Sequence, residues 1–100
     1  MRDFGFFKEL GFDGDLSIED YKYNKLLIEK EILLNFLQNE GEEWWILKVV
    51  DDPYRKNKYN PSGRRLENVR WCNYLVYLIE EKGIYPPEEL QVFINDNIGK

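Results

Sequence analysis

The sequence contains no histidine, and Cys72 is its only cysteine. Without histidine, the chain lacks the side chain that most often serves as a general base and as a metal ligand. A single cysteine excludes an internal disulfide, and the apolar neighbours of Cys72 indicate a small, buried side chain. We therefore expect neither a metal site nor a bound cofactor.

Long apolar runs are missing as well. No stretch approaches the roughly 18 consecutive apolar residues that a helix needs to span a bilayer. The first four residues do not begin a signal peptide, because Asp3 comes early and no continuous apolar stretch follows. The sequence therefore predicts a protein without a membrane partner that stays in the cytoplasm. Its 100 residues contain no repeat and no linker, which indicates a single domain over residues 1–100.

Patterns typical of catalytic sites are also lacking. Ser17 and Ser62 stand where helix caps are expected, and no histidine is present to activate either hydroxyl. Acid pairs such as Glu80-Glu81 are adjacent in the sequence, so on a helix their carboxylates point in different directions. Neither GxGxxG nor GxxxxGK, the glycine-rich phosphate-binding patterns, occurs in the chain. We predict that the protein is not an enzyme.

What the sequence does contain is helical periodicity, above all over residues 17–40. Ser17 and Asp20 have the spacing of a capping box, and Gly41 marks the expected end of the helix. Apolar residues at helical spacing on several sides are typical of a helix that is surrounded by the rest of the protein. The three rows are Tyr21, Ile28, Ile32 and Phe36; Leu26, Leu33 and Leu37; and Tyr23, Leu27 and Leu34.

Residues 42–52 allow two interpretations. The β-branched and aromatic residues over 44–50 are typical of a buried strand. A strand needs a partner, however, and the only other candidate in this interpretation is the phenylalanine-rich N-terminus. We therefore favour a helix that Pro53 ends, with a short strand over 44–50 as the alternative.

Two further helices complete the predicted fold. Asn60 is expected to cap a helix that starts at Pro61, runs to Lys82 and ends at Gly83. A last helix is expected to begin after Pro86, where prolines and acids suit a helix start. The sequence thus predicts a mainly α fold, a small bundle of about four helices around the long central helix.

Basic residues are concentrated in one segment. The chain carries 14 basic and 19 acidic residues, for a net charge of −5, yet the only acid between Pro53 and Trp71 is Glu67. Basic residues interleaved with aromatic ones, here Tyr54 and Tyr59, can attract phosphates and stack on the bases of single-stranded nucleic acid. The simpler interpretation is an exposed loop whose charges pair with neighbouring acids. The basic residues concerned are Arg55, Lys56, Lys58, Arg64, Arg65 and Arg70.

A second candidate surface combines acidic residues with Trp44 and Trp45. Two adjacent tryptophans cannot both point into one core, so we expect at least one of them to be exposed. An exposed tryptophan surrounded by acids has the composition of a protein-binding hot spot, and acidic surfaces attract basic partners. The alternative is that both indoles are buried between layers. The predicted partner-binding residues are Trp44, Trp45, Glu42, Glu43, Asp51 and Asp52.

The Pro61-Ser62-Gly63 turn, predicted to open a helix that carries Trp71, resembles a feature of the colicin-nuclease immunity family. The chain is also similar to small immunity proteins as a class, because it is acidic, poor in cysteine and rich in aromatic residues. An aspartate- and tyrosine-rich binding stretch precedes this turn in the family, whereas residues 54–59 of this chain are basic. The resemblance implies a stoichiometric inhibitor that masks a basic toxin surface.

Three functions remain open from the sequence. The leading prediction is a protein-binding inhibitor, an immunity protein that neutralises a basic, nuclease-type toxin. The first alternative is a nucleic-acid-binding regulator that uses the basic residues between 55 and 70. The second is a phage or assembly structural subunit, which would self-associate. No pattern in the sequence specifies the oligomeric state or the identity of the partner.

Overall fold

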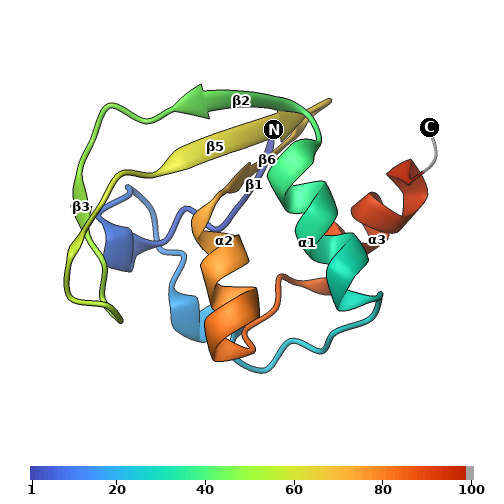
Figure 1. Cartoon of the computed structure of the whole chain (residues 1–100), viewed down its shortest axis with the longest axis horizontal. Helices are drawn as coiled ribbons and strands as arrows, with labels where there is room; N and C mark the ends of the chain where they lie inside the picture. Colours follow the sequence, from blue (N-terminus) through green and yellow to red (C-terminus); the bar gives the residue numbers. More distant parts are fainter. Residues whose placement is uncertain (99–100) are drawn as a thin grey trace.

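A β-sheet, rather than a long helix, organises the chain. The computed structural model describes residues 1–98, which form a mixed α/β fold with a four-stranded sheet, a two-stranded sheet and three α-helices (Figure 1). The strand order of the larger sheet is β1-β6-β5-β2, and β1 runs parallel to β6 while the other neighbours are antiparallel. Its strands are β1 (Arg2–Phe4), β2 (Glu42–Trp45), β5 (Ser62–Leu66) and β6 (Val69–Cys72).

The two strands of the smaller sheet lie in the segment of chain between β2 and β5. The helices lie between strands in the sequence or after the last strand. Strand β3 (Val50–Asp51) pairs antiparallel with β4 (Lys58–Tyr59). The α-helices are α1 (Lys30–Asn39), α2 (Tyr74–Tyr77) and α3 (Glu88–Asn97), and a π-helical segment, η3 (Leu78–Lys82), extends α2. Short 3-10 turns lie at η1 (Lys8–Leu10) and η2 (Ile18–Tyr21).

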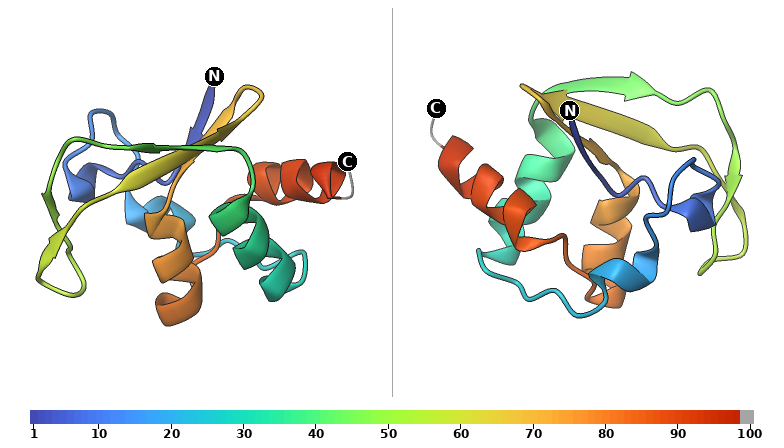
Figure 2. Two further views of the ribbon diagram at one scale, coloured as in Figure 1. Left: turned by 45° about the horizontal axis from the view of Figure 1, so that its top comes forward. Right: turned by 180° about the vertical axis from the view of Figure 1, so that it is seen from behind.

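The core lies between the helices and one face of the larger sheet (Figure 1 and Figure 2). Trp71 of β6 is fully buried there, and its ring centre lies 5.7 Å from that of Phe36 in α1. The indole Nε1–H of Trp71 donates a hydrogen bond to the Leu37 carbonyl at 2.9 Å, so its one polar group is also satisfied. Because side chains alternate along a strand, the side chain of Cys72 points to the opposite face.

The long central helix predicted over residues 17–40 is absent, so the prediction of a mainly α bundle is wrong. Only Lys30–Asn39 is α-helical in this segment. Ile18–Tyr21 forms a 3-10 turn, and residues 22–29 contain neither helix nor strand. The three apolar rows therefore do not belong to one rod.

Gln91 of α3 accounts for the interruption. Its buried side chain accepts a hydrogen bond from the Leu27 N–H at 2.7 Å, and it donates to the carbonyls of Lys25 at 2.8 Å and Pro86 at 2.9 Å. These bonds satisfy backbone groups that a helix would otherwise pair internally. The side chain of Leu27 is left exposed as a result.

The helix predicted from Pro61 to Lys82 is also wrong over its first half, which forms the β5–β6 hairpin. Leu66 and Val69, whose spacing indicated a helix, instead face each other across the turn as a cross-strand pair. Pro61 therefore precedes a strand, and Trp71 lies in a strand rather than in a helix. The local feature that resembles the colicin-nuclease immunity family thus has a different conformation here.

The helix favoured over residues 42–52 is wrong too, and the alternative of a strand over 44–50 is closer. Strands β2 and β3 occupy Glu42–Trp45 and Val50–Asp51. The partner strands that the sequence interpretation lacked are β5 and β4, because residues 58–66 had been assigned to a loop and a helix.

Several local predictions are confirmed. Ser17 and Asp20 form both halves of the capping box. Gly83 ends its helix with a φ of 62°, and a last helix begins at Glu88, directly after the prolines. Cys72 is fully buried, and burial raises the pKa of its thiol to about 12.

We expect Gly41→Ala to lower the free energy of unfolding by about 2–4 kcal/mol, measured by urea denaturation. Gly41 has a φ of 77°, and a Cβ there would lie 2.5 Å from the Arg65 carbonyl oxygen. Gly83→Ala is the matched control, since Gly83 has a φ of 62° but nothing within 4 Å of an added Cβ. Equal losses in the two variants would contradict the close approach of β5 to Gly41.

Candidate functional site

Strands β2, β3, β4 and β5 form one long hairpin that is interrupted by a bulge. The last pair of β2 and β5 is Trp45 with Ser62, and the first pair of β3 and β4 is Val50 with Tyr59. Residues 46–49 therefore oppose only two residues of the other strand. Bulges redirect side chains and are common beside functional sites.

The bulge is fixed by contacts on both sides of Leu47. The Ile46 N–H donates to the carbonyl of the residue before β5 at 3.2 Å, and the Lys48 N–H donates to the Ile46 carbonyl at 2.7 Å. The Lys48 ammonium donates to the Gly11 carbonyl and lies 5.5 Å from the centre of the Phe12 ring. These contacts hold the backbone while the Leu47 side chain projects into solvent.

Three apolar side chains are exposed together along this part of the hairpin. The exposed fractions are 63% for Trp45, 100% for Leu47 and 61% for Val49. We call these three residues the apolar edge. Single exposed apolar residues are common on protein surfaces, and large contiguous apolar patches mark interaction sites. Three exposed apolar residues within five positions make this segment the candidate site.

Acidic residues flank the apolar edge at both ends. Glu42 and Glu43 are exposed and precede it, and Asp51 is exposed and follows it. Glu43 lies 3.7 Å from Arg64, and Asp51 lies 2.6 Å from Lys58. The Asp51–Lys58 pair is exposed, and such pairs contribute only about 0–1 kcal/mol, so Asp51 can exchange its partner for a cation on another protein. In the Glu43–Arg64 pair the arginine is largely buried.

The two tryptophans lie in different environments. Trp44 is half-buried, stacks on Phe6 with ring centres 6.2 Å apart, and covers Gly63, where a Cβ would lie 2.4 Å from the indole. Trp45 points to the other face and borders a groove of about 280 Å³ that also contains Leu37 and Val76. Trp45 is thus the exposed member of the pair, and Trp44 packs against the sheet.

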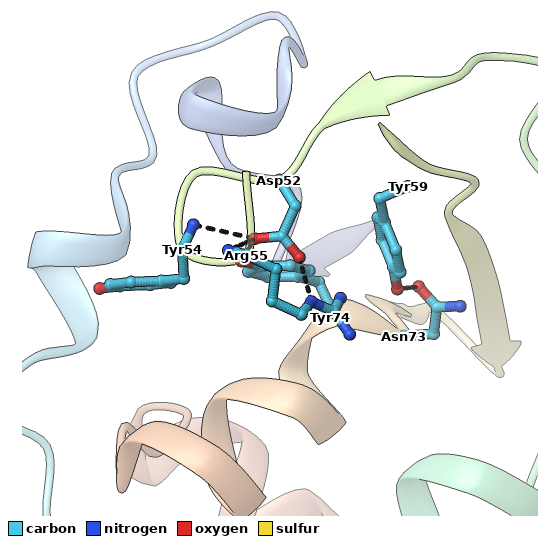
Figure 3. Close-up of polar contacts among 6 residues, drawn as sticks. All are labelled: Asp52, Tyr54, Arg55, Tyr59, Asn73 and Tyr74. Carbon is cyan, nitrogen blue, oxygen red and sulfur yellow. Dashed lines mark hydrogen bonds and ion pairs between the residues drawn. The ribbon is translucent and has the colours of Figure 1, made fainter. Parts of the chain in front are cut away.

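Asp52, predicted as a partner-binding residue, is buried and holds the tip of the hairpin instead (Figure 3). Its carboxylate accepts hydrogen bonds from the Tyr74 hydroxyl at 2.7 Å, from the Tyr54 N–H at 2.9 Å and from the Arg55 N–H at 3.0 Å. The Arg55 guanidinium also donates to this carboxylate and lies 4.0 Å from the centre of the Tyr77 ring. Asp52 therefore connects the turn to α2 and does not line the surface.

The pKa shifts in this network indicate a structural role. Burial alone would raise the pKa of the Asp52 carboxyl, but the hydrogen bonds from Arg55, Tyr74 and Tyr54 together lower it below its ordinary value. Burial, and then the bond to Asp52, raise the pKa of the Tyr74 hydroxyl. Acid–base catalysis needs a group that titrates near the working pH, and both shifts move away from neutrality.

Most of the residues predicted to bind nucleic acid are engaged within the molecule. Arg55 pairs with Asp52, and Lys58, Arg64 and Arg70 pair with Asp51, Glu43 and Asp3. The Nε–H of Arg65 donates to the Glu67 carbonyl at 3.2 Å, and Lys56 is exposed in the hairpin turn. The structure thus distributes most of the basic segment over several ion pairs, while Arg65 and Arg70 lie opposite each other on β5 and β6 and line one depression.

Another groove lies between α1 and the end of α3. It has a volume of about 530 Å³ and is lined by acidic and apolar residues, among them Glu29, Glu31, Ile32, Phe36, Glu40 and Ile98. Within residues 1–98, no group of three or more cysteine, aspartate or glutamate side chains is placed to hold a metal ion. No helix in the same range is long and apolar enough to cross a bilayer.

Comparisons with protein-family models, with curated proteins and with solved structures give no match for this chain. The site must therefore be interpreted from its own geometry.

Sequence reasoning missed Leu47 and Val49. Neither residue was among the predicted partner-binding residues in the helix or in the alternative strand. The signal that was present is Lys48, a charged residue inside the otherwise apolar run of residues 44–50. Only the bulge, which depends on pairing with β4 and β5, explains why these side chains are exposed.

We expect Asp52→Asn to lower the free energy of unfolding at pH 7 by about 2–4 kcal/mol, because a buried charged hydrogen-bond network loses its central acceptor. Chemical denaturation measures this loss. Asp51→Asn is the control, since Asp51 is exposed in the neighbouring position and its ion pair contributes less than about 1 kcal/mol.

The same variant should change the dependence of stability on pH. Because the folded-state pKa of Asp52 is lowered, its stabilisation is present above the unfolded pKa, roughly 3.9, and is lost as the pH falls toward the folded pKa. Asp52→Asn should therefore lose less stability than the natural chain on acidification below about pH 4. Parallel pH profiles for the two proteins would show that Asp52 is not the buried carboxylate described here.

Proposed function

We propose that the protein is a protein-binding inhibitor that recognises a basic partner through the apolar edge and the acids beside it. In this proposal the chain is an immunity protein of the cytoplasm that neutralises a nuclease-type toxin. The observation that carries the proposal is the complete exposure of Leu47 on an anchored bulge next to Trp45. Exposing apolar side chains from a fixed backbone has no stabilising role in the isolated domain, but it lowers the entropy cost of binding.

Trp45 and Leu47 have the properties of binding hot spots. Tryptophan is enriched among residues that contribute most of the free energy of association, and such residues lie centrally in a patch surrounded by polar groups. Trp45 borders a groove that a partner side chain can enter, and Glu43 lines the same groove. An apolar anchor and a carboxylate therefore lie within one small surface.

Electrostatics favour a basic partner over a nucleic acid. The chain has a net charge of −5, and Glu42, Glu43 and Asp51 are exposed around the apolar edge. Like charge near an interface slows association with acidic molecules, whereas opposite charge accelerates encounter with basic ones. Phosphate-bearing ligands are disfavoured at this surface for the same reason.

We expect Trp45→Ala and Leu47→Ala each to weaken binding to the partner by roughly tenfold to a hundredfold. The partner is sought by capture from the host and by co-production with the product of the neighbouring gene, and its affinity is then measured by calorimetry. Tyr23→Ala is the matched control, because Tyr23 is 87% exposed but lies outside the apolar edge. In cells, the natural chain should restore growth in the presence of the toxin, and the two edge variants should not.

The proposal fails if the bound protein is acidic, or if the edge variants bind as tightly as the Tyr23 variant. Salt-sensitive binding of single-stranded oligonucleotides that is lost in Arg65→Ala would favour the regulator instead. Self-association without a heterologous partner would favour the structural subunit.

A further inference from the structure

The outer side of β2 carries unpaired backbone groups. β2 is an edge strand, and none of the strands within residues 1–98 pairs with its outer side. The Ile46 N–H points toward β5, since it donates to the Pro61 carbonyl. Backbone groups in an antiparallel pair alternate between the partner and the opposite direction. The N–H and C=O groups of Glu43 and Trp45 must therefore point outward.

The side chains of β2 give each face of the sheet the same pair of groups. Glu42 and Trp44 lie on the open face, and Glu43 and Trp45 lie on the face that the helices cover. A depression borders the strand on each face: about 270 Å³ beside Trp44, where Arg65 and Arg70 also line it, and about 280 Å³ beside Trp45, where Arg64 also lines it. Each glutamate thus lies between an arginine of the sheet and the open side of β2. A segment that lay along this edge would meet a carboxylate and then an indole on both faces.

We propose that an extended, basic segment of the partner protein adds to β2 as a fifth strand of the larger sheet. Its two consecutive basic residues lie opposite Glu42 and Glu43, and its two consecutive apolar residues lie opposite Trp44 and Trp45. This inference rests on the proposed function and specifies which kind of partner segment is recognised. Main-chain hydrogen bonds to Glu43 and Trp45 supply affinity, and the two depressions supply specificity.

The pattern of β2 argues against a second copy of this chain as the added strand. A symmetric antiparallel pair of β2 strands that used the outward groups of Glu43 and Trp45 would place Glu43 opposite Trp45 and Trp44 opposite its own copy. Neither glutamate would then meet a cation on the added strand. A strand with cations at one end and apolar residues at the other complements both halves of Glu42–Trp45.

Amide hydrogen exchange of the full chain, followed by NMR, tests this strand addition directly. The probes are capped, threonine-flanked peptides with the central sequence Val-Val-Lys-Lys, for antiparallel pairing, or Lys-Lys-Val-Val, for parallel pairing. At ten times its Kd, the matching peptide should slow exchange of the Glu43 and Trp45 amides by roughly tenfold. Peptides in which glutamate replaces lysine should leave both rates unchanged.

Two controls separate backbone pairing from side-chain attraction. Glu43→Pro removes an outward N–H, whereas Glu43→Ala removes only the carboxylate, so the proline variant should bind the lysine peptide more weakly than the alanine variant. Proline is tolerated in edge strands on the side that has no partner. A lysine peptide with methylated backbone nitrogens tests the same point without altering the protein, and it should not protect the two amides.

The inference is overturned if neither lysine peptide protects Glu43 and Trp45, or if the glutamate peptides protect them equally. Protection that appears without peptide and grows with protein concentration would overturn it in favour of a second copy. In another outcome, a basic partner binds with an affinity that depends on Trp45 and still leaves the Glu43 and Trp45 amides in fast exchange. That result would refute strand addition but not the proposed function, which would fail only by its own test.

Discussion

The position of the apolar edge depends on a buried carboxylate, that of Asp52, at the tip of the hairpin. Asp52 accepts hydrogen bonds from two backbone N–H groups of its own turn and from the Tyr74 hydroxyl of α2, so the turn and the helix share one acceptor. Without this connection, β3 and β4 would form an isolated two-residue pair, and such short pairs are not stable alone. The bulge between β2 and β3 keeps its shape because both ends of the hairpin are fixed: one by Asp52, the other by pairing of β2 with β5.

A fixed bulge explains how a small domain can keep apolar side chains in water. Leu47 does not turn inward, because Ile46 and Lys48 on either side of it are bound to other parts of the chain. Natural edge strands are protected from uncontrolled pairing by short length and by charge, and β2 has both features in its four residues and two glutamates. In the proposed complex, the same two glutamates repel acidic strands and attract basic ones. The negative charge that prevents uncontrolled strand pairing therefore also selects the partner segment.

Sequence reasoning predicted the structural features that depend on residues close together in the chain. It failed for the features that depend on residues far apart in the chain. The Ser17 capping box and the last helix follow from neighbours along the chain, and both are present. The helix over 17–40 failed because Gln91, more than 60 positions away, binds the backbone at Leu27. The β5–β6 hairpin was missed because its turn, at Glu67, lacks the glycine that usually marks such turns. Composition alone indicated the tryptophan and glutamates of the site, whereas the exposure of Leu47 follows only from the register of two strand pairs.

The central claim is that no strand of the described residues 1–98 pairs with the outer side of β2, in a hairpin that is otherwise fixed. Native-state amide exchange of the isolated chain at low concentration, measured by NMR, tests it most directly. The amides of Ile46 and Asp52 donate hydrogen bonds within the hairpin, and they should exchange at least about tenfold more slowly than those of Glu43 and Trp45. Protection of Glu43 and Trp45 in the isolated chain, or equally fast exchange at all four positions, would contradict this account.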